Sequence, residues 1–324
     1  LNMDQKKPFG DEQRYLAGKA QMKVFHMNQY LYWRVVAVKS MRKMILQADE
    51  FYKEAGIDYS ICVPENGESD IVNNQIRNGW LFEAVSQAEQ AIEDVFSLLK
   101  NSGDIAYFAK NVVNYNATQV KDYIWKFDTN NLEYIMQEFG LPYFPLDEPW
   151  ENQEVFEEYK QAVLLMQEYL NELIHFHKKY YLDYCQYKHG MAVALCPFGN
   201  QHIKGEPEQD LREGALMTFD SYTVDRRQRA SGNLPQLAMY LTPEIQPYVS
   251  RLHEEGNLLH FSMHVVNIDD VVRITEKAYT LLSVVWMNLL KRCEMTDEDT
   301  IHEWAFPLAD YRVHVNIGFP IEKD

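Results

Sequence analysis

The sequence predicts a predominantly helical α+β fold, in which a four-helix bundle carries a small inserted β-sheet and a C-terminal strand. Long stretches with apolar residues at alternating spacings of three and four indicate helices that bury one face. Short apolar or alternating runs, which are typical of strands, fall before the last helical stretch and at the end of the chain. Because helices with apolar stripes bury them against one another, we expect the long helices to form a bundle.

The first two helical stretches lie in the first hundred or so residues. An apolar stripe runs through the first stretch, at Val24, Met27, Leu31, Val35, Val38, Met41, Ile45 and Tyr52. The stripe of the second is rich in alanine, at Leu81, Ala84, Ala88, Ala91, Val95 and Leu98. Alanine allows a neighbouring helix to approach closely, so we expect the second helix to pack tightly.

The third stretch has the most regular rhythm, an unbroken alternation of three and four from Phe156 to Tyr187. The fourth, from about Ile268 to Cys293, is apolar on most sides, as a central helix is. Residues 101–149 indicate short helices and loops. Residues 190–268 hold short strand-like runs, and the tail from Tyr311 to Phe319 alternates as a half-buried strand does.

These patterns predict either a chain of segments or one integrated domain built from them. The segments are a helical bundle at residues 1–190 with a helical insert at 101–149, a strand-rich insert at 191–267, the fourth bundle helix at 268–293, and the C-terminal strand and tail at 294–324.

The composition narrows the class of protein. Apolar residues make up 46% of the 324 residues, which indicates a folded globular chain with a substantial core. The four cysteines lie far apart without a CxxC pair, which disfavours a zinc knuckle or a disulfide framework and favours a reducing cytoplasm. No apolar run approaches the roughly 20 residues of a membrane span, and no charged-then-apolar leader opens the chain. We therefore expect a cytoplasmic protein with no membrane partner.

The net charge of −17 disfavours binding to nucleic acid, because an acidic surface repels polyphosphate. Positive charge gathers locally at Arg226, Arg227 and Arg229. This run is either a solvated loop or a ligand-binding contact for phosphate, and both interpretations stay open.

His177 is the first candidate for a functional group. It continues the apolar stripe of the third helix between Leu173 and Tyr180, so it faces the interior of the predicted bundle. It is either a core histidine bonded to a neighbouring helix or a catalytic histidine that acts with Lys178 and His189.

Other histidines are poorly placed for metal binding. Glu172 and His175 have the Glu-x-x-His spacing of di-iron bundles, but the chain holds no second such pair. His175 also lies roughly 200° from Leu173 around the helix, on its outer face. His260 and His264 fit the polar face of a half-buried strand, opposite the apolar face that carries Val265, and a metal site there would need further ligands. We expect no metal ion and no cofactor.

The third helix ends in Tyr-Lys-His-Gly at residues 187–190. Lys188 and His189 suit the negative end of the helix dipole, and Gly190 suits a left-handed cap. A long aromatic helix with this ending, in a bundle with inserts, resembles the HEPN superfamily of bacterial helical-bundle proteins. The resemblance covers residues 72–190 and 268–293.

The resemblance to HEPN proteins implies a helical-bundle fold and a habit of partnering. Ribonuclease members of that family carry an arginine, then four to six residues, then a histidine. None of the ten histidines here has an arginine in that window, so RNA cleavage is disfavoured. P-loop, Rossmann, nucleophile-elbow and zincin motifs are absent as well.

We therefore expect a non-catalytic HEPN-like protein that binds a protein partner, itself or a ligand; by the resemblance, it would serve a bacterial defence or toxin-linked system. One alternative is an enzyme that acts on RNA or nucleotides through His177, Lys178, His189 and the arginines at 226–229. Another is a structural homodimer that uses the first helix as its interface.

Overall fold

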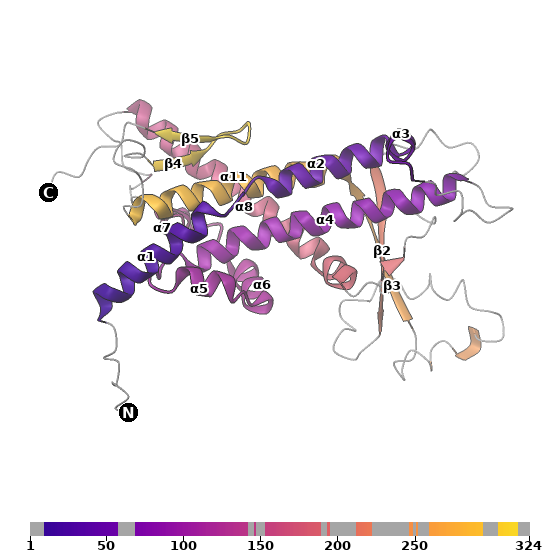
Figure 1. Cartoon of the computed structure of the whole chain (residues 1–324), viewed down its shortest axis with the longest axis horizontal. Coiled ribbons are helices and arrows are strands. Elements are labelled where there is room, and N and C mark those ends of the chain that lie inside the picture. The colour runs from indigo at the N-terminus through magenta and orange to yellow at the C-terminus, as the bar shows by residue number, and fades with distance from the viewer. Residues whose placement is uncertain are drawn as a thin grey trace. The chain divides into compact units, whose positions relative to one another are not determined.

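The computed structural model is mostly helical, and the residues it describes include two small antiparallel sheets (Figure 1). It describes residues 10–57, 69–141, 146, 153–188, 193–194, 212–221, 246–248, 251, 259–293 and 304–316. The predicted α+β class, mainly helical with a small sheet before the last long helix, is confirmed at this level. None of the described helices is both long and apolar enough to cross a membrane.

The long helices of the described residues correspond to the predicted apolar stretches, and short helices connect them. In chain order they are α1 (Asp11–Met27), α2 (Trp33–Leu46), α3 (Ala48–Glu54), α4 (Ser69–Asn101), α5 (Phe108–Val113), α6 (Ala117–Lys126), α7 (Leu132–Glu138), α8 (Gln153–Lys188) and α11 (Ile268–Arg292), with a 3₁₀ turn at Gln246–Tyr248. The expected short helices of the 101–149 insert are therefore α5, α6 and α7.

The prediction of one continuous helix through the first stripe is wrong, because the chain forms α1, α2 and α3 there. Asn28 closes α1: its side-chain Nδ2 donates to the Val24 carbonyl at 2.7 Å, and its backbone N–H donates to the Phe25 carbonyl. Val24 and Met27 are consequently 63% and 74% exposed, so the buried stripe begins only in α2.

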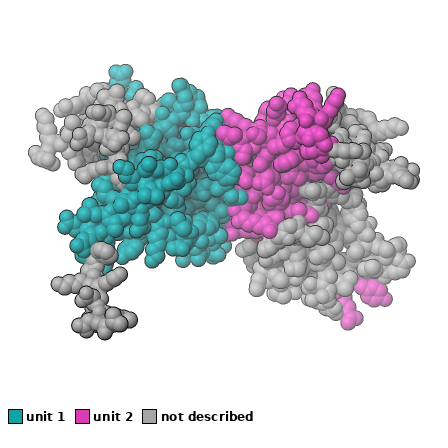
Figure 2. All heavy atoms as spheres, viewed as in Figure 1, with its two compact units in different colours: residues 1–35, 90–178, 274–324 teal, residues 36–89, 179–273 magenta. Residues whose placement is uncertain are grey.

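The chain folds into two compact units, each built from separated segments (Figure 2). Unit 1 comprises residues 1–35, 90–178 and 274–324, and unit 2 comprises residues 36–89 and 179–273. Both units include parts of α2, α4, α8 and α11. The predicted segments, with a strand-rich insert at 191–267 or one integrated domain, stay a prediction.

The core of unit 1 contains the apolar faces of α4, α8 and α11. Its fully buried side chains include Ile92, Val95, Phe96, Val163, Met166, Leu170, Leu173, Ala278, Leu281 and Leu289. Asparagine N-caps begin α6 and α7, because the side chains of Asn116 and Asn131 accept from the backbone N–H of Gln119 and Tyr134. At Gly18 of α1 an added Cβ would lie 2.4 Å from the Ile105 carbonyl oxygen, so a side chain has no room there.

The C-terminal strand of unit 1 begins later than predicted. Strand β5 (Val313–Asn316) pairs antiparallel with β4 (Trp304–Pro307). Tyr311, expected to begin the strand, instead lies in the preceding turn with φ 66°. Its backbone N–H donates to the Leu308 carbonyl. The rest of the predicted strand, residues 317–319, lies outside the described residues.

The sheet of unit 2 is antiparallel with strand order β1 (Val193–Ala194), β2 (Glu213–Ser221) and β3 (Leu259–Asn267). β2 and β3 pair along all nine residues, from Glu213 opposite Asn267 to Ser221 opposite Leu259. Gly214 lets β2 lie close to α4, because an added Cβ would be 2.6 Å from Leu81 Cδ2. This ribbon carries the strand residues of the site below.

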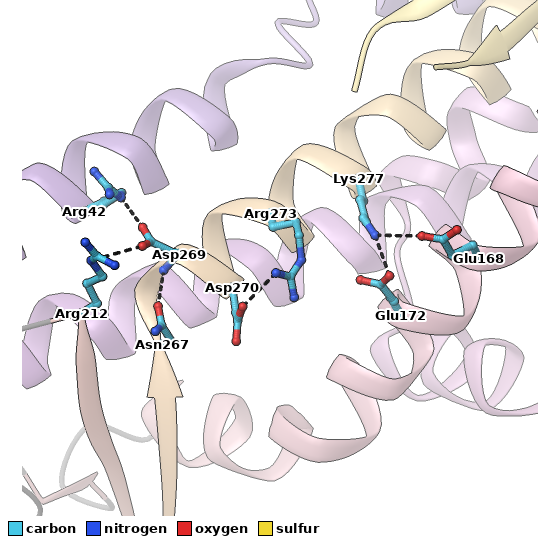
Figure 3. Close-up of polar contacts among 9 residues, drawn as sticks. All are labelled: Arg42, Glu168, Glu172, Arg212, Asn267, Asp269, Asp270, Arg273 and Lys277. Atoms are coloured by element: carbon cyan, nitrogen blue, oxygen red, sulfur yellow. Dashed lines mark hydrogen bonds and ion pairs between the residues drawn. The ribbon is translucent and has the colours of Figure 1, made fainter. Parts of the chain in front are cut away.

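The start of α11 is fixed by polar contacts within unit 2 (Figure 3). The Asn267 side chain accepts from the backbone N–H of Asp269, as an N-cap does. The Asp269 carboxylate forms ion pairs with Arg42 of α2 and with Arg212 just before β2. Both arginines are partly exposed, so these pairs position the helix start more than they stabilise it.

Candidate functional site: a histidine held by a buried carboxylate

His177 of α8 lies in the core, as its place on the apolar stripe predicted. Its side chain is 0% exposed, like that of Leu173. Burial lowers its pKa to about 4; nearby Glu93 opposes this shift, and Lys121 and Lys178 add to it. At neutral pH the imidazole is therefore uncharged and enclosed, so it could reach a substrate only if the helices moved apart.

Of the other predicted site residues, Lys178 alone lies among those that the structure describes. It follows His177 in α8 and is exposed. His189, Gly190 and the arginines Arg226, Arg227 and Arg229 lie outside the described residues. The catalytic and ligand-binding roles assigned to these residues stay predictions.

The Glu172–His175 pair does not form a metal site in the structure. His175 is exposed, as its angular position predicted. Glu172 instead accepts from the Nζ of Lys277 on α11 at 2.6 Å, and Glu168 lies 3.6 Å from the same nitrogen (Figure 3). Among the described residues, no group of three or more His, Cys, Asp or Glu side chains could hold a metal ion.

The most distinctive polar cluster lies in unit 2 and centres on Asp183 of α8. This carboxylate is 0% exposed. Its Oδ2 lies 2.8 Å from Nδ1 of His264 on β3, and its Oδ1 accepts from the hydroxyl of Thr218 on β2 at 3.0 Å. Each carboxylate oxygen thus has a hydrogen-bond partner, which a buried charge requires.

Helix α8 and the β2–β3 ribbon bring this cluster together. Tyr180 and Asp183 are three residues apart and so share a face of α8. The Tyr180 ring meets the His264 ring edge-on, with centroids 5.9 Å apart, and its hydroxyl donates to the Val265 carbonyl at 3.4 Å. Tyrosine and carboxylate together fix the imidazole's orientation.

Within the part of the chain that the structure describes, the second ring nitrogen of His264, Nε2, has no hydrogen-bond partner. A carboxylate beside Nδ1 favours the tautomer that carries its proton there, so Nε2 presents a lone pair. The His264 side chain is 35% exposed, whereas that of Asp183 is 1% exposed. Such an imidazole can accept a hydrogen bond from a ligand or take a proton from one.

The sequence interpretation of β3 needs a correction. The polar-face explanation assigned His264 to the outer face of a half-buried strand and Val265 to the inner face. In the structure Val265 is 57% exposed and Val266 is 2% exposed, while His264 contacts α8. The helix supplies a buried acceptor, so the histidine packs inward without losing a partner.

Asp183 and Thr218 are the site residues that the sequence analysis missed. The available signal was a lone acid, Asp183, in a helical stretch that also carries Tyr180, Tyr184 and Tyr187. A carboxylate beside an apolar stripe either reaches solvent or is met by donors from another element. Its partners are 35 and 81 residues away, so local spacing could not reveal them.

Comparisons with protein-family models, with curated proteins and with solved structures found no match. The resemblance to the HEPN superfamily stays a prediction.

Proposed function

We propose that this protein acts by binding a ligand or protein partner, and that His264 is a group in unit 2 that recognises it. The carrying observation is the contact between the Nδ1 of His264 and the buried carboxylate of Asp183. It holds the imidazole in one orientation, so a binder loses little side-chain entropy there. The matching chemistry is an N–H or O–H donor that Nε2 accepts.

We favour binding over catalysis, because binding requires only a hydrogen-bond acceptor, the Nε2 of His264. Among the described side chains, no serine, threonine or cysteine makes a hydrogen bond to Nε2 of His264, and Thr218 donates to Asp183 instead. A nucleophile–base pair would need such a contact. The acidic composition, with a net charge of −17, agrees with a protein partner better than with nucleic acid.

The wider proposal keeps several sequence-based expectations. These are the four-helix bundle arrangement, the cytoplasmic location, the HEPN-like partnering, the role in a bacterial defence or toxin-linked system, and self-association. The contact between His264 and Asp183 depends on none of them.

An enzyme that acts on RNA or nucleotides is the second candidate. The same contact favours it, because a carboxylate on Nδ1 orients the imidazole and holds the tautomer in which Nε2 can act as a general base. The substrate itself would then have to supply the hydroxyl or the water that is deprotonated.

The test compares His264→Gln with His175→Gln, a matched change at an exposed histidine of α8. AMP, a short single-stranded RNA, and acidic and basic peptides are titrated into the full chain, followed by thermal shift and calorimetry. We expect a probe that binds wild type and His175→Gln equally but His264→Gln about tenfold more weakly.

Equal affinity for wild type and His264→Gln would overturn the proposal. Conversion of AMP or RNA to products by wild type, lost in His264→Gln and kept in His175→Gln, would replace it with the enzymatic alternative.

A further inference from the structure

We propose that unit 1 carries a second binding site, a groove that takes a short segment of a partner protein with apolar side chains beside lysine or arginine. The groove has a volume of about 680 Å³ and lies between α8 and the end of β4. That volume is in the range of sites that enclose a few side chains. It belongs to unit 1, whereas His264 belongs to unit 2, so each site can be tested without the other.

The floor of the groove is apolar. Ala162 and Leu165 of α8 face Phe306 and Leu308 at the end of β4. Beneath them Tyr159 is 1% exposed and meets the Phe306 ring edge-on at 5.6 Å. Such a floor stabilises a complex by removing apolar side chains of the partner from water.

The rim of the groove carries negative charge. Glu157 and Glu158 both line it and both are exposed. Among the described residues neither forms an ion pair, in contrast to Glu168 on the same helix, which lies 3.6 Å from Lys277. The lining on the β4 side ends at Ala309, and just beyond it Asp310 and Arg312 pair with each other and add no net charge. Two carboxylates without an ion pair among the described residues, beside an apolar floor, match a partner that brings positive charge.

The backbone of β4 indicates how the partner is held. Both backbone polar groups of Ala305 are bonded to the Asn288 amide, at 2.8 and 3.2 Å. The Leu308 N–H donates to the Arg312 carbonyl, and the Leu308 carbonyl accepts from Tyr169. Because these groups already have partners, the occupant does not extend the sheet as an added strand. Side chains therefore provide the recognition.

The experiment measures fluorescence anisotropy of labelled peptides with the full chain. One peptide carries two leucines flanked by arginines, and its counterpart carries glutamates in place of the arginines. Three variants are compared with wild type: Glu157→Lys with Glu158→Lys, Ala162→Phe, which fills the groove without changing charge, and Glu50→Lys with Glu54→Lys. The last pair changes the net charge equally on the exposed face of α3.

We expect the arginine peptide to bind wild type and the Glu50/Glu54 variant within about twofold, and the groove variants about tenfold more weakly. The glutamate peptide should not bind. Equal weakening in both charge variants, full binding to Ala162→Phe, or no binding to wild type would overturn the proposal. A wild-type dimer that Ala162→Phe dissociates, without peptide binding, would assign the groove to a second copy of the chain instead.

Discussion

Helix α8 carries two buried polar side chains whose surroundings differ. His177 in unit 1 and Asp183 in unit 2 are both 0% exposed. Burial lowers the pKa of His177 to about 4 and keeps it neutral. Asp183 instead meets two donors, one of which belongs to the partly exposed His264. Burial alone therefore does not create a binding site. A buried polar group can contribute to one when its hydrogen-bond partner is exposed to solvent, as His264 is beside Asp183.

The largest effect on stability should come from placing a charged side chain at residue 177. His177→Asp would bury a carboxylate near the Glu93 carboxylate, so we expect it to lower the free energy of unfolding by about 4 kcal/mol. His175→Asp, at an exposed position of the same helix, should change it by no more than about 0.5 kcal/mol. Urea denaturation measures both. Similar values for the two variants would show that His177 is not in the core.

The pH dependence of stability should also come in part from His177. As the pH falls below 6.5, residue His177 becomes protonated in the unfolded chain. In the folded chain it stays neutral until about pH 4, because burial lowers its pKa. Stability is therefore lost on acidification across this window, by about 3 kcal/mol for this one group. His177→Gln should remove that part of the loss. Denaturation curves of both proteins between these pH values test it, and parallel losses would contradict the assignment.

Substitutions in the cluster of Asp183, Thr218 and His264 should lower stability by different amounts. Asp183→Ala removes the acceptor of both Thr218 and His264, so we expect a loss of about 2 to 3 kcal/mol in the free energy of unfolding. Thr218→Val removes the hydrogen bond from Thr218 and leaves the contact of Asp183 with His264 in place, so it should cost about 1 kcal/mol. If thermal and urea unfolding gave the two variants the same stability, the carboxylate would not be the centre of the cluster.

Replacing three glycines by alanine tests how closely the chain packs in each unit, and we expect these changes to lower stability by smaller amounts. In unit 1, Gly18→Ala would meet the Ile105 backbone at 2.4 Å and should cost about 2 kcal/mol. In unit 2, Gly214→Ala would meet the movable side chains of Leu81 and Asn78 and should cost about 1 kcal/mol. Gly103→Ala, with no atom within 4 Å, should change stability by at most about 0.5 kcal/mol. Thermal denaturation orders the three, and a reversed order would contradict the close approach of α1.

The sequence predicted what depends on local periodicity. The stripe of α8 placed His177 in the core and His175 outside it, and the alternating tail indicated a strand. The end of helix α1 after Met27 was not predicted. Asn28 ends this helix through hydrogen bonds, which the spacing of apolar residues does not reveal. The turn at Tyr311 was not predicted either, because the alternation of side chains continues through a residue with positive φ.

The candidate site depended on tertiary contacts. The residues Asp183, Thr218 and His264 come from a helix and two strands, and nothing in their local spacing links them. Which face of β3 is buried was decided by the helix that covers it, so the predicted inner and outer faces were reversed at Val265. A lone acid on an aromatic helix is a usable signal only once its partners are known.

We expect Asp183 to hold the proton of His264 on Nδ1, so that Nε2 can accept a hydrogen bond. Proton–nitrogen NMR correlation of the imidazole tests it most directly, with the signals assigned by their loss in His264→Gln. We expect a protonated Nδ1 in wild type, and an Nδ1 signal that shifts in Asp183→Asn. An imidazole protonated only at Nε2, with its lone pair at Nδ1 facing Asp183, would show that the carboxylate does not set the tautomer.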